Sequence, residues 1–229
     1  MLFGILSEVK SRFRQFCIFI AKILFPSFCY SCKALLHERQ ALCDVCALTI
    51  KPLVSTEIEV TGTYKMRVFC VGAYQEPLKK FVLAKSYSDH LACFYMAQLI
   101  YERSLFSRLN VDYIVPIPLH WKRYAKRGYN QSEEIAKYLS RWSGIPIKHI
   151  VMRNKATKFQ SRCDKDERIE NVKGAFAYAL NETERLSLRG KKLLLIDDVM
   201  TTGATLIAAG KMLAALKPAE LFACVLTRT

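Results

Sequence analysis

"LLLIDDVMTTGAT", residues 193–205, decides the fold, because it predicts a buried strand, a tight loop and the start of a helix. The apolar run 193–196 suits a strand that is covered on both faces, as in a parallel sheet. The overlapping segment 205–216, "TLIAAGKMLAAL", has apolar residues at helical spacing and strong helix formers. The stretch therefore predicts an α/β protein whose ligand binds beyond the carboxyl end of this strand.

The loop between strand and helix combines two kinds of ligand chemistry. Asp197 and Asp198 stand together directly after the apolar run, and Gly203 permits close backbone approach or a positive φ. Helix N-termini attract anions, whereas two carboxylates repel an anion unless they face sugar hydroxyls or hold a cation. A ribose 5′-phosphate satisfies both demands; a solvated acidic pair with a capping threonine is the plain alternative. The hydroxyls available to a phosphate belong to Thr201, Thr202 and Thr205.

This thirteen-residue combination resembles the phosphoribosyl pyrophosphate (PRPP) signature of type I phosphoribosyltransferases. The resemblance implies that the acidic pair binds the ribose hydroxyls, that the loop wraps the 5′-phosphate and that Mg²⁺ accompanies PRPP. In an active enzyme Mg²⁺ would bridge the substrate oxygens while pyrophosphate leaves the ribose C1 carbon. The PRPP-binding residues implied are Asp197, Asp198, Val199, Met200, Thr201, Thr202, Gly203, Ala204 and Thr205.

Composition describes a globular chain with a strong positive charge. The 229 residues suffice for one substantial domain and a small module, and a hydrophobic content of 52% excludes a disordered chain. The net charge of +15 favours a polyanionic partner, although solubility or an anionic membrane surface would also explain it. Segment 121–173 is strongly basic and carries interleaved aromatic residues, a pattern that suits single-stranded nucleic acid unless the aromatics are core. These aromatics are Trp121, Tyr124, Tyr129, Tyr138, Trp142 and Phe159.

Two basic segments are candidates for contact with pyrophosphate or DNA. "VPIPLHWKRYAKRGYNQSE" (115–133) predicts a strand followed by a basic loop, in which Gly128 suits a left-handed position. His120 in this loop is a candidate base, but a lone histidine is more often structural. Segment 154–174 is long and charged, which predicts either a mobile lid or a solvated surface loop. The candidate contact residues are Arg123, Lys126, Arg127, Arg162 and Lys165.

Two CxxC pairs, "CYSC" (29–32) and "CDVC" (43–46), predict a structural zinc site. Each turn directs two thiolates at one point, and two turns complete a tetrahedron; a redox-active pair or chance clustering is the alternative. His37 lies between the pairs as a possible substitute ligand, and buried packing is expected for the other five cysteines. Reduced cysteines indicate the cytoplasm. The predicted ligands are Cys29, Cys32, Cys43 and Cys46.

The opening 25 residues predict an amphipathic helix rather than a membrane span or a signal peptide. The apolar stretch 16–25 is too short to cross a bilayer, and Lys22 interrupts it. This helix either packs on the protein or lies on a membrane surface. We expect three parts: an amphipathic segment at 1–25, a zinc module at 26–54 and a phosphoribosyltransferase-like domain at 55–229. The expected location is cytoplasmic, with a peripheral position at the inner membrane left open.

Strands and helices alternate along the remainder of the chain, after a polar linker at 55–63. This alternation predicts a mostly parallel, doubly wound sheet. The strands expected besides 193–196 are 66–74, 111–119, 147–153, 175–180 and 221–227. The expected helices are 76–86, 90–106, 130–144 and 205–216.

From about residue 26 onward, the chain resembles the ComF (ComFC) family of competence-associated proteins. The resemblance rests on "CYSC…CDVC", "VPIPLHWKRYAKRGYNQSE", "TKFQSRCDKDERIENVKGAF" and "LLLIDDVMTTGAT", which occur in the family's order. It implies a zinc finger joined to a type I phosphoribosyltransferase-like domain, and a role with single-stranded DNA in natural transformation beside a helicase-like partner. The chain departs from the family at Cys163, usually apolar, and at 217–219, usually a Gly-Ala turn; both leave the fold of 154–174 open.

Two functions follow from these patterns. The first is a cytoplasmic DNA-handling protein of natural transformation that binds single-stranded DNA and carries a PRPP-binding site. The second is an active phosphoribosyltransferase that transfers ribose 5-phosphate from PRPP to an acceptor that the sequence does not identify. Net charge and the zinc module favour the first, while the acidic pair and its loop keep the second open.

Overall fold

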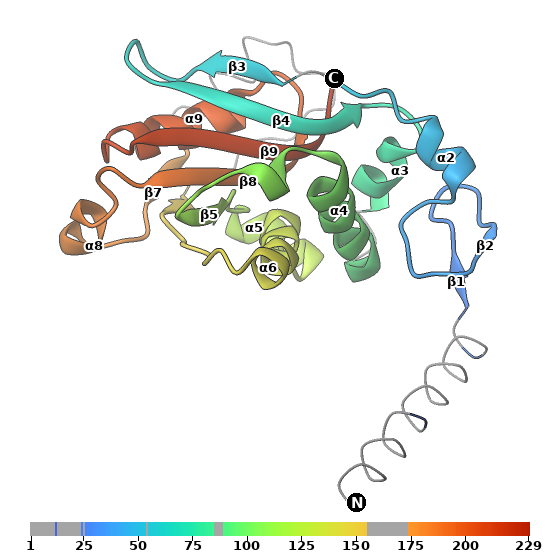
Figure 1. The fold of residues 1–229 in the computed structure, drawn as a ribbon. Helices are drawn as coiled ribbons and strands as arrows, with labels where there is room; N and C mark the ends of the chain where they lie inside the picture. Colours follow the sequence, from blue (N-terminus) through green and yellow to red (C-terminus); the bar gives the residue numbers. More distant parts are fainter. Residues whose placement is uncertain (1–11, 13–23, 25, 54, 85–88, 155–173) are drawn as a thin grey trace, which may run out of the picture.

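A five-stranded sheet with the order β3-β4-β9-β8-β5 forms the centre of the computed structural model (Figure 1). The structure describes residues 12, 24, 26–53, 55–84, 89–154 and 174–229. Neighbouring strands among β4, β9, β8 and β5 are parallel, and β3 is antiparallel to β4 at the edge. The strands are β3 (Thr56–Glu59), β4 (Lys65–Ala73), β5 (Tyr113–Pro116), β8 (Lys192–Met200) and β9 (Glu220–Arg228).

The predicted fold class, α/β with a mostly parallel sheet, is confirmed. The expectation of a plain linker at 55–63 is wrong, because Thr56–Glu59 forms the edge strand β3. Its side chains alternate between half-buried and exposed, as an edge strand with one solvated face requires. The strand was not predicted because two of its four residues are glutamates, so it contains no apolar run.

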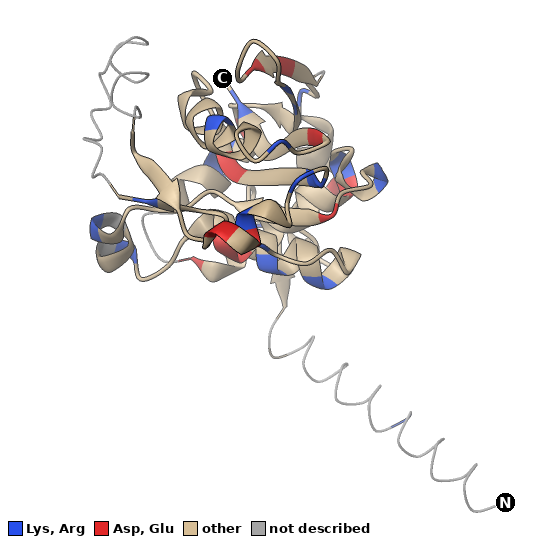
Figure 2. Cartoon of the chain, turned by 90° about the vertical axis from the view of Figure 1, so that its left-hand side faces the viewer, with Lys and Arg blue, Asp and Glu red and all other residues tan. Residues whose placement is uncertain are grey.

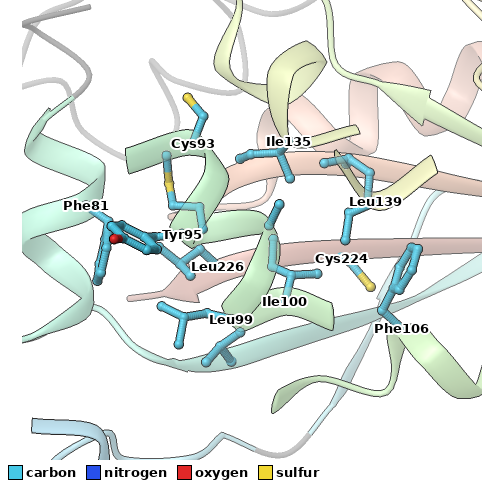
Figure 3. Close-up of a cluster of buried hydrophobic side chains, with 14 of the residues drawn as sticks. Phe81, Cys93, Tyr95, Leu99, Ile100, Phe106, Ile135, Leu139, Cys224 and Leu226 are labelled. Atoms are coloured by element: carbon cyan, nitrogen blue, oxygen red, sulfur yellow. The ribbon is translucent and has the colours of Figure 1, made fainter. Parts of the chain in front are cut away.

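Helices cover both faces of the sheet (Figure 1). Leu194 and Ile196 of β8 pack with α4 and α6 on one face, whereas Leu193 and Leu195 pack with α9 on the other. Figure 3 shows the first cluster, in which Leu99 and Ile100 of α4 lie beside Cys224 and Leu226 of β9. The helices are α3 (Leu78–Leu83), α4 (His90–Arg103), η2 (Phe106–Arg108), α5 (Trp121–Arg127), α6 (Gln131–Ser143), α8 (Glu182–Leu186) and α9 (Ala204–Ala214).

Two strands that the sequence predicts stand outside the main sheet. β6 (Val151–Arg153) and β7 (Phe176–Tyr178) form a separate antiparallel pair, so their expected place in the main sheet is wrong. The start of the predicted strand 147–153 does join that sheet, since Ile147 forms a parallel bridge with Ile114 of β5. The Tyr178 hydroxyl donates to the carbonyl of Met212 at 2.8 Å, which ties this pair to α9. The pair flanks segment 155–173, so the predicted lid lies outside the described residues.

The cysteine-bearing module sits at the carboxyl ends of the parallel strands (Figure 1). The backbone amide of Ala73, the last residue of β4, donates to the carbonyl of Lys51 at 3.0 Å. At the preceding position, Gly72, an added Cβ would lie 2.7 Å from that same carbonyl oxygen, so only glycine permits this approach. The elements of the module are β1 (Ser27–Phe28), β2 (Leu35–Leu36) and α2 (Asp44–Leu48).

The predicted N-terminal amphipathic helix lies outside the described residues, apart from Arg12 and Leu24. Of the helices in the described part of the chain, none combines the length and apolar character that a membrane crossing demands.

Candidate functional site

The acidic pair lies where β8 outlasts one of its two neighbours. Pairing between β5 and β8 stops at Pro116 and Ile196, whereas β9 continues beside β8 as far as Met200. Asp197 and Asp198 therefore have a partner strand on one side only. The predicted end of the strand at Ile196 is wrong, because pairing with β9 alone carries the strand four residues further.

Backbone and side-chain donors hold the carboxylate of Asp197. The Ser132 hydroxyl, from the first turn of α6, donates to Asp197 Oδ1 at 3.0 Å, and the backbone amide of Asp198 donates to the same oxygen at 2.9 Å. The Asn130 amide donates to the carbonyl of Ile117 at 3.0 Å, which joins the start of α6 to the end of β5. Asp197 is half-buried, while Asp198 is only 8% exposed.

The threonine-rich loop leads directly into α9. Gly203 has φ 75° and precedes the first residue of the helix, so the predicted positive φ is confirmed. The backbone amide of Ala204 faces the Thr202 hydroxyl at 3.4 Å, and Thr201 is exposed. The open N-terminus of an eleven-residue helix thus follows the acidic pair, which places a partial positive charge beside two carboxylates.

The basic segment after β5 is a helix, so the predicted loop is wrong. α5 is capped by the His120 side chain, whose Nδ1 accepts from the backbone amide of Lys122 at 3.2 Å. It ends at Gly128, whose φ of 76° confirms the predicted left-handed position. His120 is 2% exposed, and its contacts are those of a structural cap rather than those of a base.

The predicted anion contacts fall into two groups. Arg123, Lys126 and Arg127 lie in α5, at three- and four-residue spacing, and Arg127 Nη1 donates to Gln131 Oε1 at 3.3 Å. Arg162 and Lys165 lie outside the described residues.

The interleaved aromatic residues of this region are divided between surface and core. Trp121 and Tyr124 of α5 are 64% and 52% exposed, whereas Tyr129 is buried. Tyr138 and Trp142 are half-buried on α6, where their rings stack with centroids 5.9 Å apart. Phe159 lies outside the described residues. Among the described residues named here, only the two aromatics of α5 present most of their ring surface to a nucleobase.

His90, Cys93 and Tyr129 form a polar group between the start of α4 and the turn before α6, which the sequence did not predict. The His90 ring packs on the Tyr129 ring with centroids 4.8 Å apart. Burial raises the pKa of Tyr129 to about 12 and that of Cys93 to about 12, to which the charges of Glu134 and Asp198 add for Cys93. The thiol and the phenol are therefore uncharged at neutral pH. No local motif signals this group, because its members come from α4 and from the turn before α6.

Four cysteines gather at one point of the module, as the sequence predicts. The Sγ atoms of all four lie within 4.8 Å of one another, and those of Cys32 and Cys43 are 3.6 Å apart. A tetrahedral zinc site with Zn–S bonds of about 2.3 Å requires sulfurs about 3.8 Å apart. Four thiols at this spacing fit zinc, with the ligands Cys29, Cys32, Cys43 and Cys46.

Two of the four thiols, Cys29 and Cys46, differ in their readiness to ionise. Burial opposes ionisation of Cys29, but backbone hydrogen bonds, first those involving Cys32 and Cys43, outweigh it and lower its pKa to about 6. Burial and hydrogen bonds with the other thiols raise the pKa of Cys46 to about 12. Because metals bind thiolates, a cluster that already stabilises one thiolate is suited to capture a divalent soft metal.

Comparisons with known proteins agree with the geometry. The sequence profile of the phosphoribosyl transferase domain matches residues 125–229. Competence protein F of Haemophilus influenzae is 40% identical over 101 residues, 44% of this chain and 43% of its own length. Competence protein ComFC of Bacillus subtilis is 36% identical over 113 residues, 48% of this chain and 42% of its own. DNA utilization protein YhgH of Escherichia coli K12 is 26% identical over 197 residues, 81% and 83% of the two chains. The chain thus aligns with less than half the length of both competence proteins.

Solved structures with some likeness are phosphoribosyltransferases. An adenine phosphoribosyltransferase has 15% sequence identity and a TM-score of 0.36, with 79% of this chain and 89% of that chain covered. The adenine phosphoribosyltransferase of Saccharomyces cerevisiae has 16% identity and a TM-score of 0.36, with 80% and 90% covered. The mostly parallel sheet and the domain profile over residues 125–229 together agree with the predicted phosphoribosyltransferase-like fold.

Proposed function

Because this chain is a relative of competence proteins F and ComFC and carries a phosphoribosyl transferase domain, we propose that it handles DNA during natural transformation. In this role it binds single-stranded DNA and carries a site for PRPP or a related phosphoribosyl ligand. The names of its relatives, which refer to competence and DNA utilization, support the role in DNA uptake.

The ligand site is supported by one observation above all: the one-sided end of β8, where a buried and a half-buried carboxylate precede an open helix N-terminus. Asp197 and Asp198 would accept hydrogen bonds from ribose hydroxyls. The loop from Thr201 to Thr205 would hold the 5′-phosphate through hydroxyls and backbone amides. Mg²⁺ bound with PRPP would neutralise the charge of the pyrophosphate near the two carboxylates.

The DNA surface is supported by α5. Its exposed Trp121 and Tyr124 offer rings on which bases stack, and Lys122 Nζ lies 5.5 Å from the Trp121 ring centroid. Such alternation of basic and aromatic side chains binds single strands without reading their sequence. Lys and Arg also lie on several other elements around the molecule (Figure 2), in keeping with the net charge of +15. This general charge would steer a polyanion toward the protein.

A titration of labelled oligothymidine at about 50 mM and about 200 mM salt tests DNA binding. Affinity that falls with salt supports the proposal, because released counterions drive such binding. The same oligonucleotide as a duplex is the control. Equal affinity for both forms would contradict a preference for single strands, and no binding at the lower salt would remove the DNA role.

The alternative function is an active phosphoribosyltransferase. It is favoured by the acidic pair and by the threonine-rich loop that ends at Gly203, since these are the parts that the PRPP signature requires. Incubation with PRPP, Mg²⁺ and a panel of nucleobases tests it by release of pyrophosphate. Release that depends on one base would establish the enzyme and name its acceptor. PRPP binding without release would leave the site with a binding or regulatory role.

The proposed location is the cytoplasm. The seven cysteines that the structure describes are all unbridged, and four of them form the metal cluster, which suits a reducing compartment.

A further inference from the structure

Tyr30 joins the cysteine cluster to the sheet domain. It directly follows Cys29, and its backbone amide donates to the carbonyl of Ala41 at 3.0 Å, two residues before the second CxxC pair. Its ring stacks on Phe81 of α3 with centroids 4.3 Å apart, and its hydroxyl donates to Asp89 Oδ2 at 2.7 Å. The position of this side chain thus depends on both halves of the cysteine cluster.

Asp89, the partner of Tyr30, is the cap of α4. Its second oxygen, Oδ1, accepts from the backbone amide of Ala92 at 2.9 Å, so one carboxylate serves both the module and the helix. Loss of the phenol would leave a half-buried carboxylate with one donor fewer at the start of α4.

From the start of α4, contacts continue to the acidic pair. The residue after Asp89 is His90, whose ring packs on Tyr129. Tyr129 lies in the turn between α5 and α6, and the first turn of α6 supplies the Ser132 hydroxyl that holds Asp197. The first turn of α4 and the turn that leads into α6 thus meet through this pair of rings. A displacement of Asp89 would therefore reach the carboxylate of Asp197 through the start of α4 and the start of α6.

We propose that Tyr30 is a positioning residue that couples metal occupancy of the four-cysteine cluster to phosphoribosyl-ligand affinity at Asp197 and Asp198. This inference rests on the proposed function for its ligand. A bound metal fixes the Cys29 turn, and with it the Tyr30 hydroxyl, the cap of α4 and the Tyr129 contact. By linkage the coupling is reciprocal, so the ligand raises metal affinity by the same factor as the metal raises ligand affinity.

The test compares wild-type protein with Tyr30→Phe, which keeps all four thiols and the aromatic ring but loses the bond to Asp89. Tyr178→Phe is the matched control, because it loses a phenol hydrogen bond of 2.8 Å on the opposite face of the sheet. PRPP with Mg²⁺ is titrated by calorimetry into the zinc-loaded and zinc-free forms of each. Zinc affinity is measured against a chelator with and without PRPP.

In wild-type protein and in Tyr178→Phe, we expect zinc to strengthen PRPP binding at least about fivefold, and PRPP to strengthen zinc binding equally. In Tyr30→Phe both factors should fall toward one while zinc still binds. Equal factors in wild type and Tyr30→Phe would overturn the proposal, as would factors of one in wild type.

Amide exchange at Ala92, whose partner is Asp89, gives a readout that needs no ligand. We expect faster exchange there in Tyr30→Phe and in the zinc-free protein than in wild type or in Tyr178→Phe. Unchanged exchange would overturn the link between Tyr30 and α4. Faster exchange in a protein that shows no PRPP binding would instead remove the proposed ligand and, with it, the coupling, while leaving the structural link established.

Discussion

Ser132 donates its hydroxyl to Oδ1 of Asp197 across 3.0 Å, and this bond joins the first turn of α6 to the strand that carries the acidic pair. The backbone amide of Asp198 donates to the same oxygen. Two donors on one oxygen fix the orientation of a carboxylate that has a neighbouring strand on one side only. A carboxylate fixed in this way loses little freedom when a sugar hydroxyl binds to it, so the site is preorganised.

Replacing the acidic pair by Asp197→Asn and Asp198→Asn should weaken PRPP binding at least about tenfold, or about 1.4 kcal/mol. The amides keep the shape of the side chains but lose the charge that strengthens bonds from ribose hydroxyls. Calorimetry with PRPP and Mg²⁺ measures the change. Asp112→Asn is the control, because Asp112 accepts from the backbone amide of Lys192 at the opposite end of β8. Equal affinity in the double variant and this control would contradict the site.

The cysteine cluster should hold about one zinc ion per chain. Cys29→Ser with Cys32→Ser should release it, because two of the four thiolates are lost, and should unfold the module while the sheet domain stays folded. Metal analysis and circular dichroism measure the two effects. Cys70→Ser, which changes a buried thiol outside the cluster, is the control for loss of cysteine alone. A fully folded wild-type protein without zinc, purified in metal-free buffer, would sink the prediction.

Replacing Arg123, Lys126 and Arg127 by Ala should weaken binding of single-stranded DNA and flatten its salt dependence. Each phosphate contact contributes about −0.7 to the slope of log affinity against log salt, so the slope should change by about two. Because Arg127 is also a candidate contact for pyrophosphate, PRPP binding is measured on the same variant. An unchanged slope would place the DNA away from α5.

Trp121→Ala should separate stacking from charge on the same helix. Loss of one stacked base costs about 1–3 kcal/mol in affinity for single strands and leaves the salt slope nearly unchanged. Trp142→Ala is the comparison, because Trp142 is half-buried in an aromatic cluster and packs on Tyr138 and Phe94. If both variants bind DNA like wild type, the rings of α5 are not a stacking surface.

Gly72→Ala should destabilise the protein by about 1–3 kcal/mol, because the added Cβ would lie 2.7 Å from a backbone oxygen of Lys51. The strain falls on the contact between β4 and the end of the cysteine module, so metal release should also become easier. Urea unfolding and chelator competition measure the two. Gly62→Ala adds the same methyl group where no heavy atom lies within 4 Å, and should leave both values near wild type. The reverse order of the two variants would refute this packing.

The central motif was predictable because its physics is local. An apolar run buried on both faces, followed by a glycine and a helix-forming segment, leaves little choice of structure. The extension of β8 beyond Ile196 was not predictable, since aspartates disfavour strands and only pairing with β9, a later segment, holds them in one. The helical state of α5 was missed because the helix is only seven residues long, too short to show a clear apolar period, and because histidine is an unusual cap.

The site was predictable as a set of residues but not as an arrangement. The acidic pair can be recognised because its two residues are adjacent, and the four cysteines because they form two CxxC pairs. Tyr30 and Asp89 carry no such signal, because they meet only when a module near the start of the chain packs against α3 and α4. Contacts of this kind depend on tertiary structure, for which a single sequence gives no period or motif.

The central position of β9 has a consequence for folding during synthesis. β4 ends at Ala73, but its parallel neighbour β9 begins only at Glu220, so a growing chain leaves this edge of β4 unpaired until the residues of β9 have been made. At ribosomal speeds that interval is on the order of ten seconds. The four cysteines lie within eighteen residues and can meet early, whereas the sheet must wait for β9. Chaperones that shield nascent chains should therefore bind this protein at residues 68–71, and a chain truncated before residue 220 could not close its sheet.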